Sequence, residues 1–216
     1  MKAKVNVPSD LSEVTLKQYQ EFLKAKEVNN DPYKMQCKVI EIFCNVNEGI
    51  VRKMKLSDVE KISIIINKMF EHKTPLIKFF TLNGVEYGFI SDLDNISFGE
   101  YIDLDNNISD WQNMHLAMNV LFRPIKQRLG KKYIIEEYNL DNKIVIQDMP
   151  LSAVMGSIFF LFRLGIDLSK AMTKSLTKQE KKALTQYLTS EGNGDGINQF
   201  MHSLEEMLQD LKISQN

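Results

Sequence analysis

Residues 76–90, with the sequence LIKFFTLNGVEYGFI, decide the fold class of this chain. Two β-prone runs flank Asn83-Gly84, and both central positions of a tight hairpin turn need a positive φ, which asparagine and glycine adopt readily. The segment therefore predicts a β-hairpin within a chain whose other signals are mostly helical. We expect an α+β fold, mainly helical, with a central β-hairpin or small antiparallel sheet.

Three helix-start signals precede this hairpin. Each signal is a pair of residues. The first has a side chain that can accept hydrogen bonds from the amides of the first helical turn, and the second, one or three residues later, is typical of a helix start. The three pairs are Thr15 with Gln18, Asp31 with Pro32, and Ser57 with Glu60. They predict helices over about residues 15–28, 32–44 and 57–72.

Helical signals return after the hairpin. Ser97 with Glu100 predicts the cap of a helix that carries Phe98, Tyr101, Ile102 and Ile108, and Ser109 with Gln112 predicts the cap of the next helix. This second helix should stop near Arg123, because a proline follows. The remaining expected elements are two short strands within residues 131–147 and helices over about 150–172, 177–189 and 197–211.

The predicted elements make up one domain, residues 1–216. Its approximate subregions are N-terminal helices (1–73), the hairpin with the acidic helix pair and small sheet (74–148), and C-terminal helices (149–216). The segment 149–168, MPLSAVMGSIFFLFRLGIDL, is the most apolar, but Arg163 and Asp167 interrupt it, so we expect a buried central helix and no membrane span. Sharing of this helix between subunits is the alternative.

The composition indicates a folded globular protein in a reducing environment and argues against a general nucleic-acid binder. Hydrophobic residues make up 44% and charged residues 25% of the 216 residues, which is typical of a folded globular protein. The net charge of -1 argues against a general nucleic-acid binder, which needs a basic excess. Cys37 and Cys44 lie seven residues apart on one predicted helix, about 10 Å along its axis, too far for a disulfide, so we expect a reducing environment.

The charges are unevenly distributed along the chain. No lysine or arginine occurs between Lys78 and Arg123, whereas seven carboxylates do: Glu86, Asp92, Asp94, Glu100, Asp103, Asp105 and Asp110. A basic run follows, with Arg123, Lys126, Arg128, Lys131 and Lys132. A solvated acidic face, a divalent-cation site and a docking surface for a basic partner all remain open as interpretations.

No catalytic or metal-binding motif accompanies these charges. His72, His115 and His202 are isolated, and neither cysteine has an adjacent histidine. The chain also lacks a phosphate-binding glycine loop and a nucleophile elbow. We therefore predict no catalytic residue, no metal ligand, no cofactor and no small-molecule substrate.

Four segments of the chain resemble a known protein family. They are ISFGEYIDLD (96–105), the pattern DW..MH.AM.VLFRPI (110–125), MPLSAVMGSIFF (149–160) and GDGINQFMHSLEEMLQDL (194–211). The sequence is similar to a family of virion-associated or tail-assembly proteins from tailed bacteriophages of Bacteroidetes and marine hosts, including crAss-like phages. The resemblance implies a context, the assembly of a phage particle, and no reaction.

These observations together predict a non-enzymatic phage protein that contacts other proteins as a virion or tail-associated component, structural or cargo. A tail-assembly chaperone absent from the mature particle is the alternative, and a DNA-binding accessory or a metal-dependent hydrolase are further ones. The expected partners are phage structural or tail proteins or further copies of the chain, in the host cytoplasm or in the virion. The predicted contact residues are Asp92, Asp94, Glu100, Asp103, Asp105, Trp111, Arg123, Lys126, Arg128 and Phe200.

Overall fold

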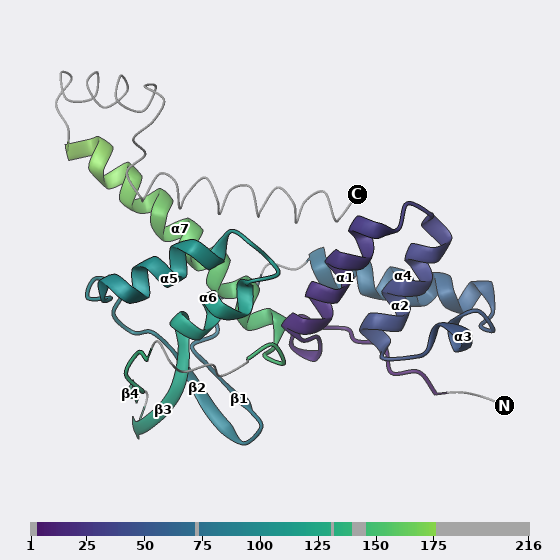
Figure 1. The fold of residues 1–216 in the computed structure, drawn as a ribbon, viewed down its shortest axis with the longest axis horizontal. Helices are drawn as coiled ribbons and strands as arrows, with labels where there is room; N and C mark the ends of the chain where they lie inside the picture. The colour runs from purple at the N-terminus through teal and green to yellow at the C-terminus, as the bar shows by residue number, and fades with distance from the viewer. Residues whose placement is uncertain (1–3, 72–73, 131, 140–145, 176–216) are drawn as a thin grey trace.

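The computed structural model describes residues 4–71, 74–130, 132–139 and 146–175 (Figure 1). Within these residues the chain forms seven α-helices and one four-stranded antiparallel sheet. The expected α+β fold is therefore confirmed. Buried side chains from the N-terminal helices, the sheet region and the last described helix join in one hydrophobic core.

Four helices form the N-terminal part. They are α1 (Leu16–Val28), α2 (Pro32–Cys44), α3 (Glu48–Val51) and α4 (Leu56–Glu71). The Thr15 capping box and the Asp31 cap with Pro32 are both present as predicted. The predicted Ser57 cap is wrong, because the amides of Asp58 and Val59 donate to the carbonyl oxygen of Lys55, so α4 begins at Leu56.

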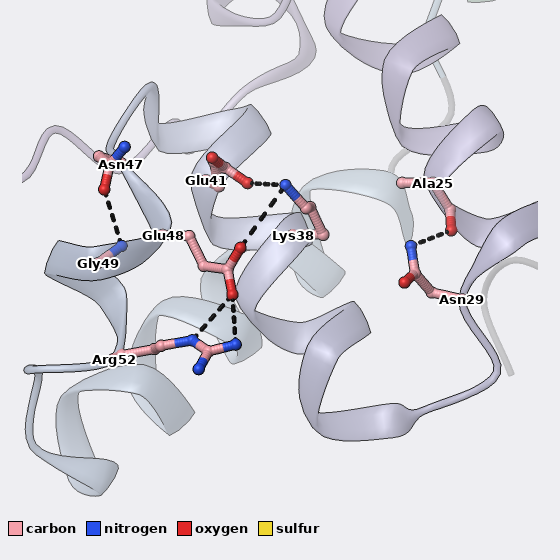
Figure 2. Close-up of polar contacts among 8 residues, drawn as sticks. All are labelled: Ala25, Asn29, Lys38, Glu41, Asn47, Glu48, Gly49 and Arg52. Carbon is pink, nitrogen blue, oxygen red and sulfur yellow. Dashed lines mark hydrogen bonds and ion pairs between the residues drawn. The ribbon is translucent and has the colours of Figure 1, made fainter.

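An ionic bridge fastens the short helix α3 to α2 (Figure 2). The ammonium group of Lys38 contacts Glu41 on its own helix and reaches Glu48 on α3 at 3.8 Å. Glu48 also accepts from Arg52, with 2.6 Å between Oε1 and Nη2. Asn47 caps α3 by accepting the amide hydrogen of Gly49. Since these groups are partly exposed, we expect the bridge to orient α3 more than to stabilise it.

The predicted hairpin is present. Strand β1 (Phe79–Leu82) pairs with β2 (Val85–Phe89), and the turn between them has φ of 51° at Asn83 and 79° at Gly84. Both turn residues therefore adopt the left-handed conformation that their sequence predicts.

The second hairpin is formed by β3 (Phe122–Leu129) and β4 (Lys132–Ile135), in a sheet of order β1-β2-β3-β4. The basic run after Leu121 was not expected to be a strand. Phe122 ends the preceding helix in an extended conformation and packs its ring against Phe80 and Phe89, which aligns the following residues with β2. Of the two strands expected within 131–147, only the first is observed as β4, and residues 140–145 lie outside the described part.

Helices α5 (Phe98–Ile108) and α6 (Met114–Leu121) connect the two hairpins. The predicted Ser97 cap of α5 is confirmed, with the full capping box. The predicted Ser109 cap is wrong, because Ser109 ends α5 and α6 starts only at Met114. The Asp110 carboxylate instead accepts the backbone amide of Gln112, so it organises the connecting turn.

Helix α7 (Leu151–Ser175) starts in the middle of the molecule and runs outward to the upper left of Figure 1. Its first turns are covered within the single chain: Leu151, Ala153, Val154 and Ile158 have no exposed surface. The buried first turns agree with the prediction of a central helix, and the helix is only partly buried from Phe159 onward. The start of α7 is joined to that of α1, since the amide of Leu151 donates to Val14 at 2.8 Å. No helix in the described part is long and apolar enough to span a bilayer.

Two aromatic groups fill the core. Phe80, Tyr87, Phe89 and Phe122 share one face of the sheet, and Phe89 meets Phe160 of α7 edge to face at 5.8 Å. A second group joins the N-terminal helices to the turn before α6, and consists of Tyr19, Phe22, Phe43, Phe70 and Trp111. The helices predicted over 177–189 and 197–211, and with them Phe200, lie outside the described residues.

Candidate protein-binding surface on helix α5

The capping box fixes where α5 begins. The hydroxyl oxygen of Ser97 accepts the amide hydrogen of Glu100 at 3.3 Å, and the Ser97 amide donates to Oε2 of Glu100 at 2.7 Å. The other carboxylate oxygen, Oε1, lies 2.9 Å from Nη2 of Arg123 on β3. One buried carboxylate therefore both caps its own helix and holds that helix on the sheet.

A second contact ties α5 to the chain after β4. The hydroxyl group of Tyr138 donates to the carboxylate of Asp103. Burial, and then this hydrogen bond to a negative group, raise the pKa of Tyr138 to about 12. The Tyr138 hydroxyl group therefore stays protonated at neutral pH and can donate this hydrogen bond. The Asp103 carboxylate is thus already bound within the chain.

The exposed side of α5 carries a mixed apolar and acidic stripe. Its members, at positions i, i+3, i+4 and i+7, lie on one side of the helix: Phe98, Tyr101, Ile102 and Asp105. Phe98 is 78% exposed and Ile102 is 38% exposed. We call these four residues the α5 stripe. The sequence had suggested Phe98 and Ile102 as part of an apolar pattern, but the buried side consists of Glu100, Leu104 and Ile108.

Acidic groups lie at both ends of the α5 stripe. Asp105 is at its C-terminal end. Burial, and to a smaller extent the negative charge of Asp105, raise the pKa of the neighbouring Tyr101. Asp94 is exposed in the turn before α5. Within the described residues neither carboxylate has a hydrogen bond or an ion pair. Asp92, by contrast, accepts from the Asp94 amide and from Asn95, which shapes the turn.

The predicted basic contact residues are mostly neutralised within the chain. Arg123 is bound to Glu100, and Arg128 is bound to Glu86 while its guanidinium lies 4.2 Å from the centre of the Phe79 ring. Lys126 is exposed on β3. Opposite charges that are well separated along the sequence thus meet in space, so Glu100 and Arg123 do not form separate acidic and basic surfaces.

Trp111 is buried, in contrast to its prediction as a contact residue. Only 7% of it is exposed, and its ring meets Tyr19 edge to face at 4.8 Å. Its indole Nε1 has no hydrogen-bond partner among the described residues. The structure therefore places Trp111 in the core.

The acidic stretch does not converge on one point. In the part of the chain that the structure describes, no group of three or more histidine, cysteine or acidic side chains is arranged to hold a metal ion. Most carboxylates of this stretch serve instead as a helix cap, as ion-pair partners, as turn formers or as the acceptor of the Tyr138 hydroxyl group.

Comparisons with models of protein families, with curated proteins and with solved structures found no match.

Proposed function

We propose that this chain is a non-enzymatic protein that acts by binding other proteins during the assembly of a tailed-phage particle, with the α5 stripe as its contact surface. The proposal takes its context from the resemblance of four segments to phage virion-associated and tail-assembly proteins. Its expected location is the host cytoplasm during assembly, and the virion if the protein is a component of the particle.

One observation carries the choice of surface. Phe98 exposes 78% of its surface beside Ile102, on a helix that the ion pair of Glu100 and Arg123 joins to the sheet. Large apolar side chains on a rigid element, with charged groups around them, are typical of the centre of a protein interface. The partners implied are phage structural or tail proteins, or further copies of the chain.

The test uses the phage that encodes the chain. Phe98→Asp should reduce the amount of this protein in purified particles at least tenfold, as measured by quantitative mass spectrometry. Tyr33→Asp is the matched control, because Tyr33 is an equally exposed aromatic residue in the first turn of α2. Both aspartates stand in a first helical turn, where an acidic side chain is favourable, so both variants should fold.

The same experiment separates the two forms of the proposal. A virion component is found in wild-type particles, whereas an assembly chaperone is missing from them and its Phe98→Asp variant lowers the yield of tailed particles. The proposal is wrong if Phe98→Asp changes neither the particle composition nor the yield.

A further inference from the structure

The turn between β1 and β2 contains a pair of residues that can react with each other. Asn83 is followed by Gly84, and among the asparagines of the described residues it alone precedes a glycine. A backbone amide nitrogen can attack the side-chain carbonyl carbon of an asparagine that precedes it. Glycine hinders this attack least, because it carries no side chain.

Both reacting groups are accessible in the folded chain. Asn83 and Gly84 are exposed, and a Cβ atom built on Gly84 would meet no atom within 4 Å. Within the described residues, neither the Asn83 side-chain amide nor the Gly84 backbone amide makes a hydrogen bond. The turn lies at the lower tip of the molecule in Figure 1. No described group therefore shields or holds the two reacting groups.

The backbone conformation of the turn slows the reaction. Asn83 and Gly84 have φ of 51° and 79°, in the left-handed region. Attack on the side chain closes a five-membered imide ring, which fixes the ψ angle of the asparagine outside that region. The reaction therefore proceeds from molecules in which the outer end of the hairpin has opened locally.

This outer end can open without disturbing the core. The turn is flanked by the pair Leu82 and Val85, and Val85 is 43% exposed. Two residues further in, the ring of Phe80 stacks on that of Tyr87 at 5.5 Å, and both side chains are buried. Local opening therefore needs to break only the exposed pairs beyond this stack.

We propose that Asn83 is a site of spontaneous deamidation, independent of the proposed function. The Gly84 nitrogen gives up its proton and bonds to Cγ of Asn83, and the side-chain nitrogen leaves as ammonia. Water then opens the imide ring. Attack of water at the side-chain carbonyl gives aspartate, and attack at the backbone carbonyl gives isoaspartate. One water molecule is consumed and one ammonia is released, with no change of oxidation state.

The two products have different effects on the hairpin. Asp-Gly suits this type of turn as well as Asn-Gly does, so aspartate at position 83 keeps the hairpin and adds one negative charge. Isoaspartate places an extra carbon atom in the backbone between Leu82 and Val85, which no longer fits a two-residue turn. The stack of Phe80 on Tyr87 retains the inner end of the hairpin. Isoaspartate therefore loosens the tip of the sheet and leaves its base paired.

Peptide mapping by mass spectrometry tests the site in the full chain. The folded protein is incubated at neutral and at mildly alkaline pH, and conversion is followed at each asparagine. Asn83 should react at least tenfold faster than Asn30 and Asn67. These two are equally exposed but are followed by Asp31 and Lys68, whose side chains hinder the attack. Conversion at Asn83 should accelerate at the higher pH, because the deprotonated amide is the nucleophile.

Unfolding and hydrogen exchange test the role of the turn. Asn83 should react faster in urea-unfolded chain than in native chain, because the turn is then always open. Ion exchange separates the modified protein, and its isoaspartate fraction should exchange the Val85 amide faster than the wild type while the Phe89 amide stays protected. Asn83→Asp is the matched control, since it carries the same charge with a normal backbone, and its exchange should equal that of the wild type.

Two outcomes would overturn the proposal. In the first, Asn83 of the native chain reacts no faster than Asn30 and Asn67. In the second, Asn83 reacts in urea and stays unchanged in the native chain, which would show that the closed turn protects it completely. An isoaspartate fraction whose Val85 amide exchanges as in the wild type would contradict the loosening of the tip.

Discussion

Glu100 and Arg123 form a buried ion pair across the junction of α5 and β3. The carboxylate Oε1 and the guanidinium Nη2 are 2.9 Å apart, and their side chains are 8% and 12% exposed. The pair joins the helix that presents the proposed contact surface to the sheet that supports it. Removal of one partner would leave the other charge buried, which is more costly than removal of both.

Arg123→Met should therefore lower the free energy of unfolding by about 3 kcal/mol, because it leaves the Glu100 carboxylate unpaired in the interior. Urea unfolding measures this loss. The double variant E100Q/R123M should lose less stability than the sum of the losses of Glu100→Gln and Arg123→Met, since it removes both charges. Strictly additive losses would show that the two groups do not interact.

His115 should make stability depend on pH in the weakly acidic range. Burial lowers its pKa from the ordinary 6.5, and the Gln112 backbone opposes this shift in part. Between the lowered pKa of His115 in the folded chain and its pKa of 6.5 in the unfolded chain, only the unfolded chain binds the proton. The contribution of His115 to the free energy of unfolding is therefore complete above pH 6.5 and is lost as pH falls through the lowered pKa.

The measurement is urea unfolding of the wild type and of His115→Gln from pH 7.5 to pH 5.5. The difference between the two proteins isolates the histidine, because the carboxylates are common to both. The wild type should lose more stability on acidification. Parallel pH profiles would show that His115 does not titrate differently in the folded state.

The two cysteines should react at different rates. Cys44 is buried, and burial raises the pKa of its thiol to about 11, whereas Cys37 is partly exposed. The thiolate is the reactive form, so a disulfide reagent should label one thiol per native chain quickly and the second only on unfolding. Cys37→Ser should abolish the fast reaction. Rapid labelling of the native Cys37→Ser variant would contradict the burial of Cys44.

Gly156 should tolerate no side chain. A Cβ atom at this position of α7 would lie 2.4 Å from the carbonyl oxygen of Pro75. Gly156→Ala should therefore destabilise the protein by about 1–3 kcal/mol, measured by thermal unfolding. Gly99→Ala is the control: its Cβ would lie 3.5 Å from the Tyr138 ring, so the helix propensity of alanine should stabilise it by about 0.5 kcal/mol. A neutral Gly156→Ala would show that α7 can shift.

Several elements could be predicted because their determinants lie close together in the chain. The Asn83-Gly84 turn, the Thr15 and Ser97 capping boxes and the central position of α7 are all as their sequence indicates. The predictions of the Ser57 and Ser109 caps were wrong because other groups nearby accept the amide hydrogen bonds. The carbonyl oxygen of Lys55 accepts at the start of α4, and the carboxylate of Asp110 accepts in the turn before α6.

The candidate site could be predicted only in part. The sequence indicated an acidic α5 region with Asp94 and Asp105, but it also assigned Glu100, Arg123 and Trp111 to the surface, whereas these three side chains lie largely inside. It did not indicate that Phe98 and Ile102 face outward, because apolar residues at helical spacing are expected on the buried side of a helix.

By itself, the sequence determined the Asn83-Gly84 turn, most helix starts and the apolar character of the start of α7, because backbone dihedral preferences and capping hydrogen bonds act within about four residues. Only the tertiary structure decided which side of α5 faces outward and which charges remain unpaired. The reason is that burial and ion pairing depend on residues brought together from distant parts of the chain, as Arg123 is brought to Glu100 by the pairing of β3 with β2.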